Sequence, residues 1–170
     1  MNSFLTGIII VFGILVLWTI FVCIKVSNRQ NRTLKAFKTV DSLLKKRYEF
    51  IPDILTNALS NSTEERSFLE DTKQLYMEVL SLGANLKTLD RRIALDGKLA
   101  QNISRIITSL NNTVEVQAVN EYNKEYDKIL CAKNKYNTLA GKLKTTVEVF
   151  PSSLISRFMN VKSLDFIYMI

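Results

Sequence analysis

The sequence predicts an all-α protein, in which a single N-terminal transmembrane helix is followed by an antiparallel bundle of long helices. Three observations lead to this prediction. The 170 residues include only 5 glycines and 2 prolines, too few turn-forming residues for a many-stranded sheet. Residues 4–24 carry no charged side chain. From residue 34 onward, apolar residues recur at spacings of three and four, which is the period of an amphipathic helix.

Residues 4–24 read FLTGIIIVFGILVLWTIFVCI and form the predicted transmembrane helix, after a short tail of residues 1–3. A helix that rises ~1.5 Å per residue needs about 20 residues to cross a hydrocarbon core of ~30 Å. A cleaved signal peptide would have a basic start, a shorter apolar core and small residues at the cleavage site. The segment has none of these, so we expect an uncleaved single-pass span in the cell membrane.

Basic residues follow the span and predict its orientation. Residues 25–50 hold eight Lys and Arg side chains against two acidic ones, so they carry six of the seven net positive charges of the chain. By the positive-inside rule, the N-terminus lies outside and the C-terminal domain is cytoplasmic. The cluster is either a topology signal alone or also a surface for anionic membrane lipid. Its members nearest the span are Lys25, Arg29, Arg32, Lys35 and Lys38.

The predicted helical bundle occupies residues 25–150. Its first apolar stripe runs from Leu34 to Ala58 and stays in phase across Pro52. A proline inside a helix removes a backbone donor and clashes with the preceding turn. We therefore expect the helix either to kink at Pro52 or to restart there.

A second apolar stripe, with one unbroken phase, runs through residues 62–110. Ser62 and Glu65 have the spacing of a capping box and predict a helix start. The glycines within residues 83–85 and 95–97 are two possible break points. The sequence leaves open whether this region forms one helix or two.

A predicted loop at residues 110–117 precedes the last long helix. The apolar stripe of that helix runs from Val119 to Phe150, and Pro151 is expected to stop it. Residues 151–170 form an apolar tail that is broken by charges and is too short to be a second span. We expect this tail to pack on the bundle or on the membrane interface.

The composition argues against catalysis. The chain has no histidine, which removes the commonest general base and the commonest metal ligand. Its two cysteines, Cys23 and Cys131, lie far apart. The sequence contains no phosphate-binding glycine loop, no zinc or calcium motif and no nucleophile elbow. We expect no enzymatic activity, no cofactor, no metal site and no small-molecule substrate.

The sequence also contains tyrosines next to lysines, a pattern that nucleic-acid-binding proteins use. Tyr122, Tyr126 and Tyr136 lie among lysines, as do aromatic residues that stack on bases. The three tyrosines also occupy the apolar stripe of the last long helix. We therefore expect them to pack in the core, and we expect no nucleic-acid partner.

Two segments resemble the LemA family. VDSLLKKRYEFIPDIL at 40–55 is similar to its N-terminal motif, with Phe50 and Asp53 in place of the usual Leu and Asn. NKYNTLAGKLKTTVEVFPSSLISRFMNVKSLDFI at 134–167 is similar to its C-terminal signature. The second Tyr-Asn pair of the family is replaced at 143–144, and its Tyr-Pro-x-Leu is absent, so the chain resembles a divergent member. The matching positions are Arg47, Tyr48, Ile51, Pro52, Tyr136, Asn137, Phe150 and Pro151.

The resemblance implies one N-terminal span, an antiparallel helical bundle, and no established catalytic site or cofactor. With the stripes and the basic cluster, it leads us to expect a membrane-anchored homo-oligomer that acts as a scaffold or organises membrane. The alternative is an adaptor that presents its bundle, or its tail from Leu154 to Ile170, to another membrane protein such as a protease or a sensor kinase. We also expect Pro52 to mark a bend that packs on Phe150 and Pro151.

Overall fold

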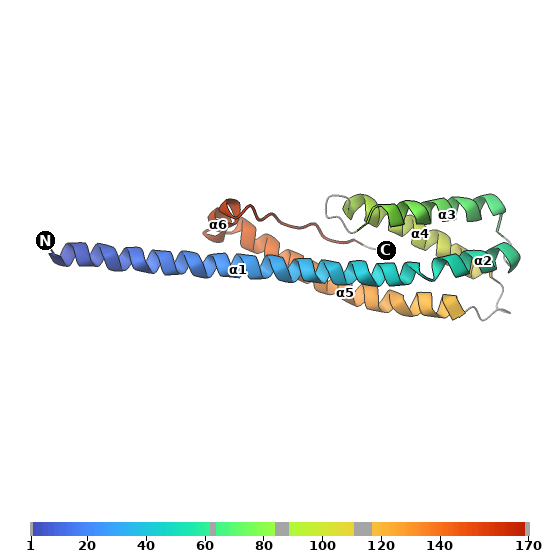
Figure 1. Cartoon of the computed structure of the whole chain (residues 1–170), viewed down its shortest axis with the longest axis horizontal. Coiled ribbons are helices and arrows are strands. Elements are labelled where there is room, and N and C mark those ends of the chain that lie inside the picture. The colour runs from blue at the N-terminus through green and yellow to red at the C-terminus, as the bar shows by residue number, and fades with distance from the viewer. Residues whose placement is uncertain (1, 62–63, 84–88, 111–116, 169–170) are drawn as a thin grey trace. The chain divides into compact units, whose positions relative to one another are not determined.

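A computed structural model of the protein describes residues 2–61, 64–83, 89–110 and 117–168. The long elements in these ranges are helices, which confirms the predicted all-α class and the long apolar helix that precedes a helical bundle. Figure 1 shows them in chain order: α1 (Asn2–Tyr48), α2 (Ile51–Asn61), α3 (Arg66–Ser81), α4 (Leu89–Ser109), α5 (Gln117–Glu148) and α6 (Ser152–Phe158). The helix that contains the predicted span continues past residue 24 without a break.

The chain divides into two compact units. The first unit comprises Met1–Phe37 and Lys135–Phe166, and the second comprises Lys38–Asn134 and Ile167–Ile170. Helices α1 and α5 contribute residues to both units.

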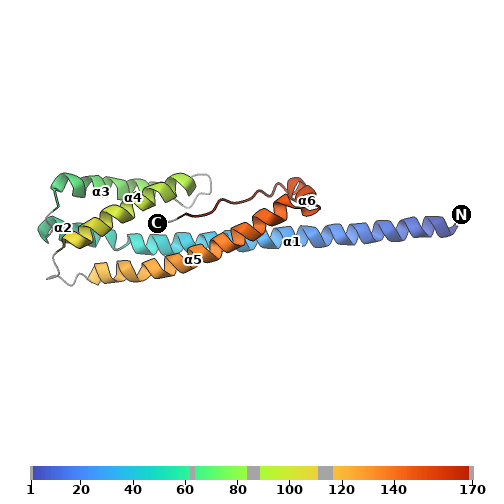
Figure 2. The same cartoon turned by 180° about the vertical axis from the view of Figure 1, so that it is seen from behind.

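In the first unit, α1 and the C-terminal half of α5 lie side by side and run antiparallel (Figures 1 and 2). Val22 and Val26 of α1 pack with Leu143 of α5 in one buried cluster. About three turns beyond Val26 on α1, the Phe37 ring lies 6.0 Å from the Tyr136 ring, centroid to centroid. Residue numbers therefore rise along α1 as they fall along α5.

The chain after α5 folds back onto this pair of helices. Val161 is buried in the same cluster as Val22, and Ile155 of α6 packs against it. The Tyr136 hydroxyl donates a hydrogen bond to the Asp165 carbonyl over 2.8 Å. Residues 155–165 are thus held on the helices of the first unit by apolar packing and by a tyrosine from α5.

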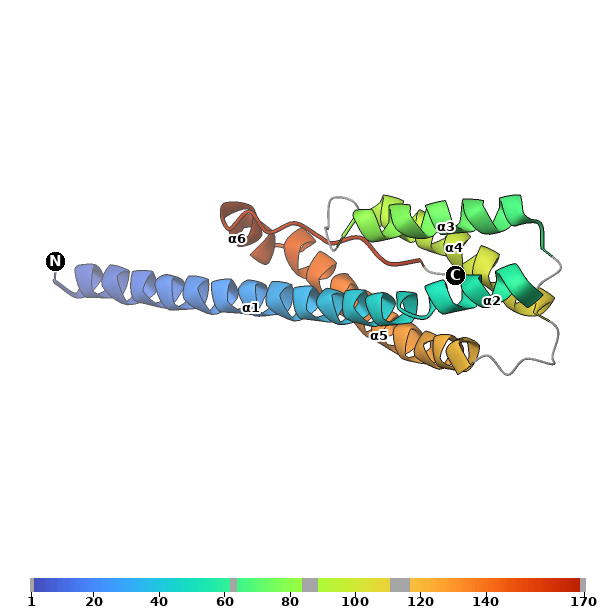
Figure 3. The same cartoon turned by 45° about the vertical axis from the view of Figure 1, so that its right-hand side comes forward.

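In the second unit, α2, α3 and α4 contact one another (Figure 3). Their apolar core includes side chains that are 1% exposed or less, among them Ile51, Ile54, Val79, Leu99, Ile103 and Ile106. Each helix places apolar residues three or four apart on its inner face, as helix geometry requires. This core is the scaffold on which the charged side chains described below are positioned.

The proline near the end of the first stripe marks a restart. Helix α1 ends at Tyr48 and α2 begins at Ile51, so Pro52 lies in the first turn of α2. A proline there is tolerated because first-turn N–H groups have no partner within the helix. Pro52 is exposed in the second unit and Phe150 belongs to the first, so the expected packing of Pro52 on Phe150 and Pro151 stays a prediction.

The second stripe is divided between two helices. Helix α3 ends at Ser81, and Gly83 has a φ of 57°, a left-handed conformation that glycine adopts without strain. The break therefore falls at the first of the two expected positions, whereas Gly97 lies inside α4. Helix α3 begins at Arg66, later than the capping box predicts. Ser62 of that box, and residues 111–116 of the expected loop, lie outside the described residues.

The buried face of α4 agrees in part with the predicted stripe. The unbroken phase predicts Ala100 and Ile107 on the inner face, but both are only partly buried. Leu99 and Ile106 are buried instead. The predicted stripe is therefore confirmed at Asp96, Ile103 and Leu110, which are buried, and it is wrong by one residue at Ala100 and Ile107.

Candidate functional site

Charged side chains are buried in the second unit where α1, α4 and α5 contribute residues. Asp41 of α1 and Asp96 of α4 both occupy positions within apolar stripes, and each is less than a tenth exposed. Arg92 of α4 donates a hydrogen bond from Nη1 to Asp41 Oδ1 and another to the Gly83 carbonyl over 3.1 Å. Lys45 Nζ lies 3.0 Å from the other carboxylate oxygen of Asp41. One carboxylate thus joins α1 to α4.

A second set of contacts surrounds the end of α1. The Tyr48 hydroxyl donates a hydrogen bond to Asp96 Oδ1. The neighbouring Arg47 is buried, and its guanidinium carbon lies 4.0 Å from the centroid of the Tyr122 ring and 5.2 Å from that of Tyr126. An arginine over an aromatic face is attracted by the negative charge density of the ring. These contacts connect α1 with α4 and α5.

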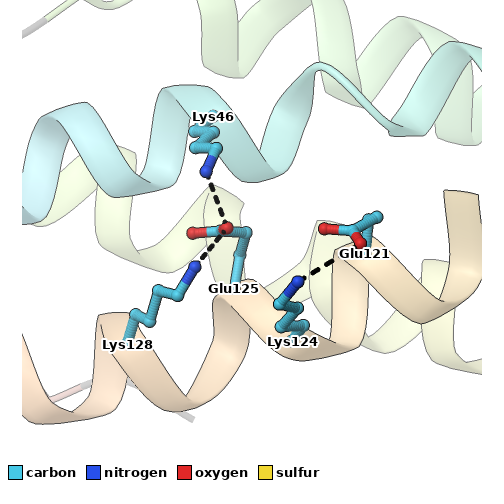
Figure 4. Close-up of polar contacts among 5 residues, drawn as sticks. All are labelled: Lys46, Glu121, Lys124, Glu125 and Lys128. Atoms are coloured by element: carbon cyan, nitrogen blue, oxygen red, sulfur yellow. Dashed lines mark hydrogen bonds and ion pairs between the residues drawn. The ribbon is translucent and has the colours of Figure 1, made fainter.

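A third set, shown in Figure 4, lies on α1 and α5. The Glu125 side chain is 1% exposed, and its Oε1 accepts from Lys46 Nζ over 2.9 Å and from Lys128 Nζ over 2.8 Å. Glu121 pairs with Lys124 one turn away, 3.4 Å apart. Hydrogen bonds from Lys128 and Lys46 hold the pKa of Glu125 below its usual value. The carboxylate therefore stays ionised between two ammonium groups.

The two buried aspartates have pKa values shifted in opposite directions. Burial opposes ionisation of Asp41, but hydrogen bonds from Arg92 and Lys45 outweigh it and lower its pKa. For Asp96, burial is the dominant effect and raises the pKa, although the Tyr48 hydrogen bond and the nearby Arg47 oppose it. The difference arises because Asp41 receives two charged donors, while Asp96 receives a neutral hydroxyl.

Replacing Asp96 by Asn is expected to change how stability depends on pH. Above the usual carboxyl pKa of 3.8, the folded protein retains the Asp96 proton that the unfolded chain releases. The free energy of unfolding of the unchanged protein therefore falls as the pH rises through this window. Asn does not titrate, so the stability of Asp96→Asn relative to the unchanged protein should rise with pH.

Urea denaturation followed by circular dichroism, just above pH 3.8 and at neutral pH, measures this difference. Asp127→Asn, which alters an exposed carboxyl group, controls for the change in net charge. A constant difference between Asp96→Asn and the unchanged protein at both pH values would contradict the prediction.

The buried charges of the second unit form a layer in which each described carboxylate contacts a cation or a hydroxyl. Burial raises the pKa of Tyr48, which keeps its hydroxyl a neutral donor. Burial also raises the pKa of Tyr122 to about 12. Among the described residues, no group of three or more Cys, Asp or Glu side chains is arranged to hold a metal ion. The described contacts pair the carboxylates with cations and a hydroxyl of the same unit, so they fix the register of the helices.

The positions that resemble the family motifs are distributed over both units. Arg47 and Tyr48 lie in the charged layer, and Ile51 lies beside them in the core of the second unit. Tyr136 is fully buried in the first unit, with the partly buried Asn137 next to it. The remaining positions are more open: Pro52 is exposed, Phe150 is 74% exposed and Pro151 is partly buried.

The basic cluster after the apolar stretch is mostly exposed on α1. Lys25, Arg32, Lys35 and Lys38 are exposed. Arg29 is partly buried, because its guanidinium donates to the Lys142 carbonyl over 2.9 Å and to the Thr146 hydroxyl. An open groove follows one face of α1 and changes from apolar to cationic along its length; it is lined by Phe21, Ile24, Lys25, Asn28, Arg29 and Arg32.

Sequence reasoning missed Arg92 and Glu125 as members of the charged layer. A signal was present for the two aspartates, since each interrupts an otherwise apolar stripe. An acidic residue on an inner face needs a buried partner, because an isolated charge is too costly to bury. The identity of that partner depends on which helices meet. The tyrosines expected in the core are indeed buried in the case of Tyr122 and Tyr136.

Comparison with known proteins gives one match. The model of the LemA family matches residues 36–169, which is most of the chain. No characterised protein matches the sequence, and no solved structure matches it. The matched region begins after the apolar stretch of α1 and extends through the helices of both units.

Proposed function

The chain belongs to the LemA family, and from this premise we propose that it is a non-enzymatic, membrane-anchored protein that self-associates as a scaffold. Family membership and the apolar part of α1 together indicate a membrane-associated protein. The proposal adds a single-pass span in the cell membrane, an N-terminus outside, a cytoplasmic helical domain and a homo-oligomeric state.

The observation that carries the proposal is the exposure of the apolar part of α1. Residues 5–21 are exposed without exception, and side chains as large as Phe12 and Leu17 are 68% and 70% exposed. Water-soluble monomers rarely expose a contiguous apolar surface of this kind. The same stretch is long and apolar enough to cross a membrane. A lipid environment covers these side chains and removes the cost of exposing them to water.

The orientation and the lipid partner are supported by the cations that follow the span. Lys25 and Arg32 are exposed within the groove that begins at Phe21 and Ile24. Such a groove suits an anionic phospholipid, with an acyl chain beside the apolar residues and a headgroup beside the cations. The excess of cations on this side of the span favours a cytoplasmic location for the rest of the chain.

Self-association is supported by an exposed apolar strip on α3. Met77 and Leu80 lie three residues apart on one face of the helix, and they are 55% and 43% exposed. Anchoring confines the chain to two dimensions, which raises its local concentration and lets a small contact area suffice. The proposed absence of a catalytic role is supported by the charged layer, in which Asp41, Asp96 and Glu125 each contact a cation or a hydroxyl of the same unit.

The mass of the full-length protein in nanodiscs, measured by light scattering, tests the scaffold. We expect a discrete multiple of the 19.5 kDa chain. Met77→Glu places a charge in the α3 strip and should reduce the multiple to a monomer. Ser104→Glu adds the same charge at an exposed position of α4 and should leave the multiple unchanged.

A monomeric unchanged protein would exclude self-association and favour the adaptor. In that case, crosslinking from the tail between Leu154 and Ile170 would be used to identify a membrane-protein partner such as a protease or a sensor kinase. A multimer that survives Met77→Glu would exclude the α3 strip as the contact surface.

A further inference from the structure

Four large apolar side chains are exposed between the end of α5 and the end of α6. They lie outside the expected transmembrane span, so that span does not account for their exposure. Residues 149–158 form this α5–α6 corner. Val149 is 53% exposed, Phe150 74%, Leu154 51% and Phe158 92%. Such a concentration of exposed apolar surface on so short a segment indicates a contact with an apolar environment.

The corner lies beside the end of the exposed apolar stretch of α1. Val22 is the first buried residue after that stretch, and it packs in a cluster with Leu143 and Val161. Val147 at the end of α5 and Ile155 of α6 pack against the same cluster. All these residues belong to the first unit, so their relative placement is defined. Figures 1 and 2 show α6 next to this part of α1.

Hydrogen bonds hold the corner in shape. The Ser152 hydroxyl donates to the Thr146 carbonyl over 2.7 Å, with the Val149 carbonyl 2.9 Å away. The buried Ser156 hydroxyl lies 2.9 Å from the Ser153 carbonyl and 3.3 Å from that of Val147. These serines occupy the inner side of α6. The apolar side chains are left on the outer side, held outward by a fixed backbone.

The charges near the corner are mostly cationic. Lys144, Arg157 and Lys162 are exposed close to it in sequence, against one acidic residue, Glu148. Lys25 lies one turn beyond Val22 on the neighbouring helix. Apolar side chains bordered by lysine and arginine are typical of segments that lie in the interface of an anionic membrane.

We propose that the α5–α6 corner is a second membrane contact, which inserts its apolar side chains into the lipid interface beside the point where α1 leaves the hydrocarbon core. This proposal rests on the membrane anchoring proposed above. The two contacts together fix the rotation of the first unit about the axis of α1, which a single helix cannot do.

Fluorescent labelling of the full chain in vesicles of phosphatidylethanolamine and phosphatidylglycerol tests the proposal. Single cysteines carrying an environment-sensitive nitrobenzoxadiazole probe are introduced in a Cys23→Ser and Cys131→Ser background. Phe158→Cys labels the corner, and Leu15→Cys labels the span. Asp165→Cys is the matched control, because Asp165 is exposed on the same tail and its carbonyl accepts a hydrogen bond from Tyr136. The Tyr136 ring lies beside Phe37, and Phe37 is about 22 Å along α1 from Val22 by helix rise. The control position is therefore expected to lie away from the membrane.

The probe at Phe158→Cys should show blue-shifted emission, quenching by nitroxide-labelled lipid and loss of quenching by aqueous iodide. The probe at Asp165→Cys should be quenched by iodide alone. Iodide quenching at both tail positions, with the Leu15→Cys probe still in lipid, would overturn the second contact and leave the anchoring intact. Protection of the Phe158→Cys probe from both quenchers would overturn it in favour of a protein partner. Iodide quenching at Leu15→Cys would overturn the anchoring itself.

Discussion

Replacing Arg92 by Leu is expected to lower the free energy of unfolding by about 3–5 kcal/mol, because it leaves the buried Asp41 carboxylate without its main partner. The side chains of Arg92 and Asp41 are 6% and 8% exposed, so water cannot replace the lost guanidinium. Lys45 remains within reach of Asp41, but its own side chain is 55% exposed and extends into solvent. Urea denaturation of the full chain in detergent, followed by circular dichroism, measures the loss.

The adjacent residue provides a matched control. Arg91 also pairs with a carboxylate, Glu78, over 2.7 Å, but its side chain is 68% exposed. Exposed ion pairs typically contribute only about 0.2–1 kcal/mol. Arg91→Leu should therefore cost far less than Arg92→Leu, although both remove one arginine and one ion pair. Equal losses of unfolding free energy in the two variants would show that the buried ion pair contributes no more to stability than the exposed one.

Truncating Ile106 to Ala is expected to destabilise the second unit by about 2–5 kcal/mol, because Ile106 is fully buried and the change leaves a cavity. Ile106 lies in the same cluster as Ile54 and Ile103, and these helices cannot collapse around a missing side chain without disturbing one another. The midpoint and slope of urea denaturation give the change in free energy.

Ile107→Ala removes the same atoms from the next residue of α4, which is only partly buried. The loss should be smaller, since part of the deleted surface already contacts water. This pair of variants distinguishes the observed inner face of α4 from the face that the unbroken stripe predicts. A larger loss in Ile107→Ala than in Ile106→Ala would support the predicted face over the observed one.

Several features followed from the sequence because they depend on local physics. The uncharged run of residues 4–24 is long enough to span a bilayer whatever it packs against, and it is helical in the structure. The three-four spacing gave the helices and most of the inner face of α1 and α5, including Phe37, Tyr122 and Tyr136. Resemblance in two motifs was enough to indicate the family that the comparison then showed.

Other features depended on contacts between segments far apart in the chain. The sequence offered two breaks within residues 62–110, and only the structure chose Gly83 over Gly97. Glycine is compatible with both a helix interior and a left-handed turn, so its identity alone does not decide. The sequence also left open whether the helix kinks or restarts at Pro52. A proline can kink a continuous helix, and it is also tolerated in the first turn of a new one.

By itself the sequence determined the helical class, the apolar N-terminal helix and the placement of cations after it, since backbone hydrogen bonding and hydrophobic periodicity act within one segment. Only the tertiary structure decided which charged side chains are buried and which residues they pair with. Asp41 and Arg92 are 51 residues apart, and Lys46 and Glu125 are 79 apart. A buried carboxylate requires a partner, but the pattern along one helix cannot specify which other helix supplies it.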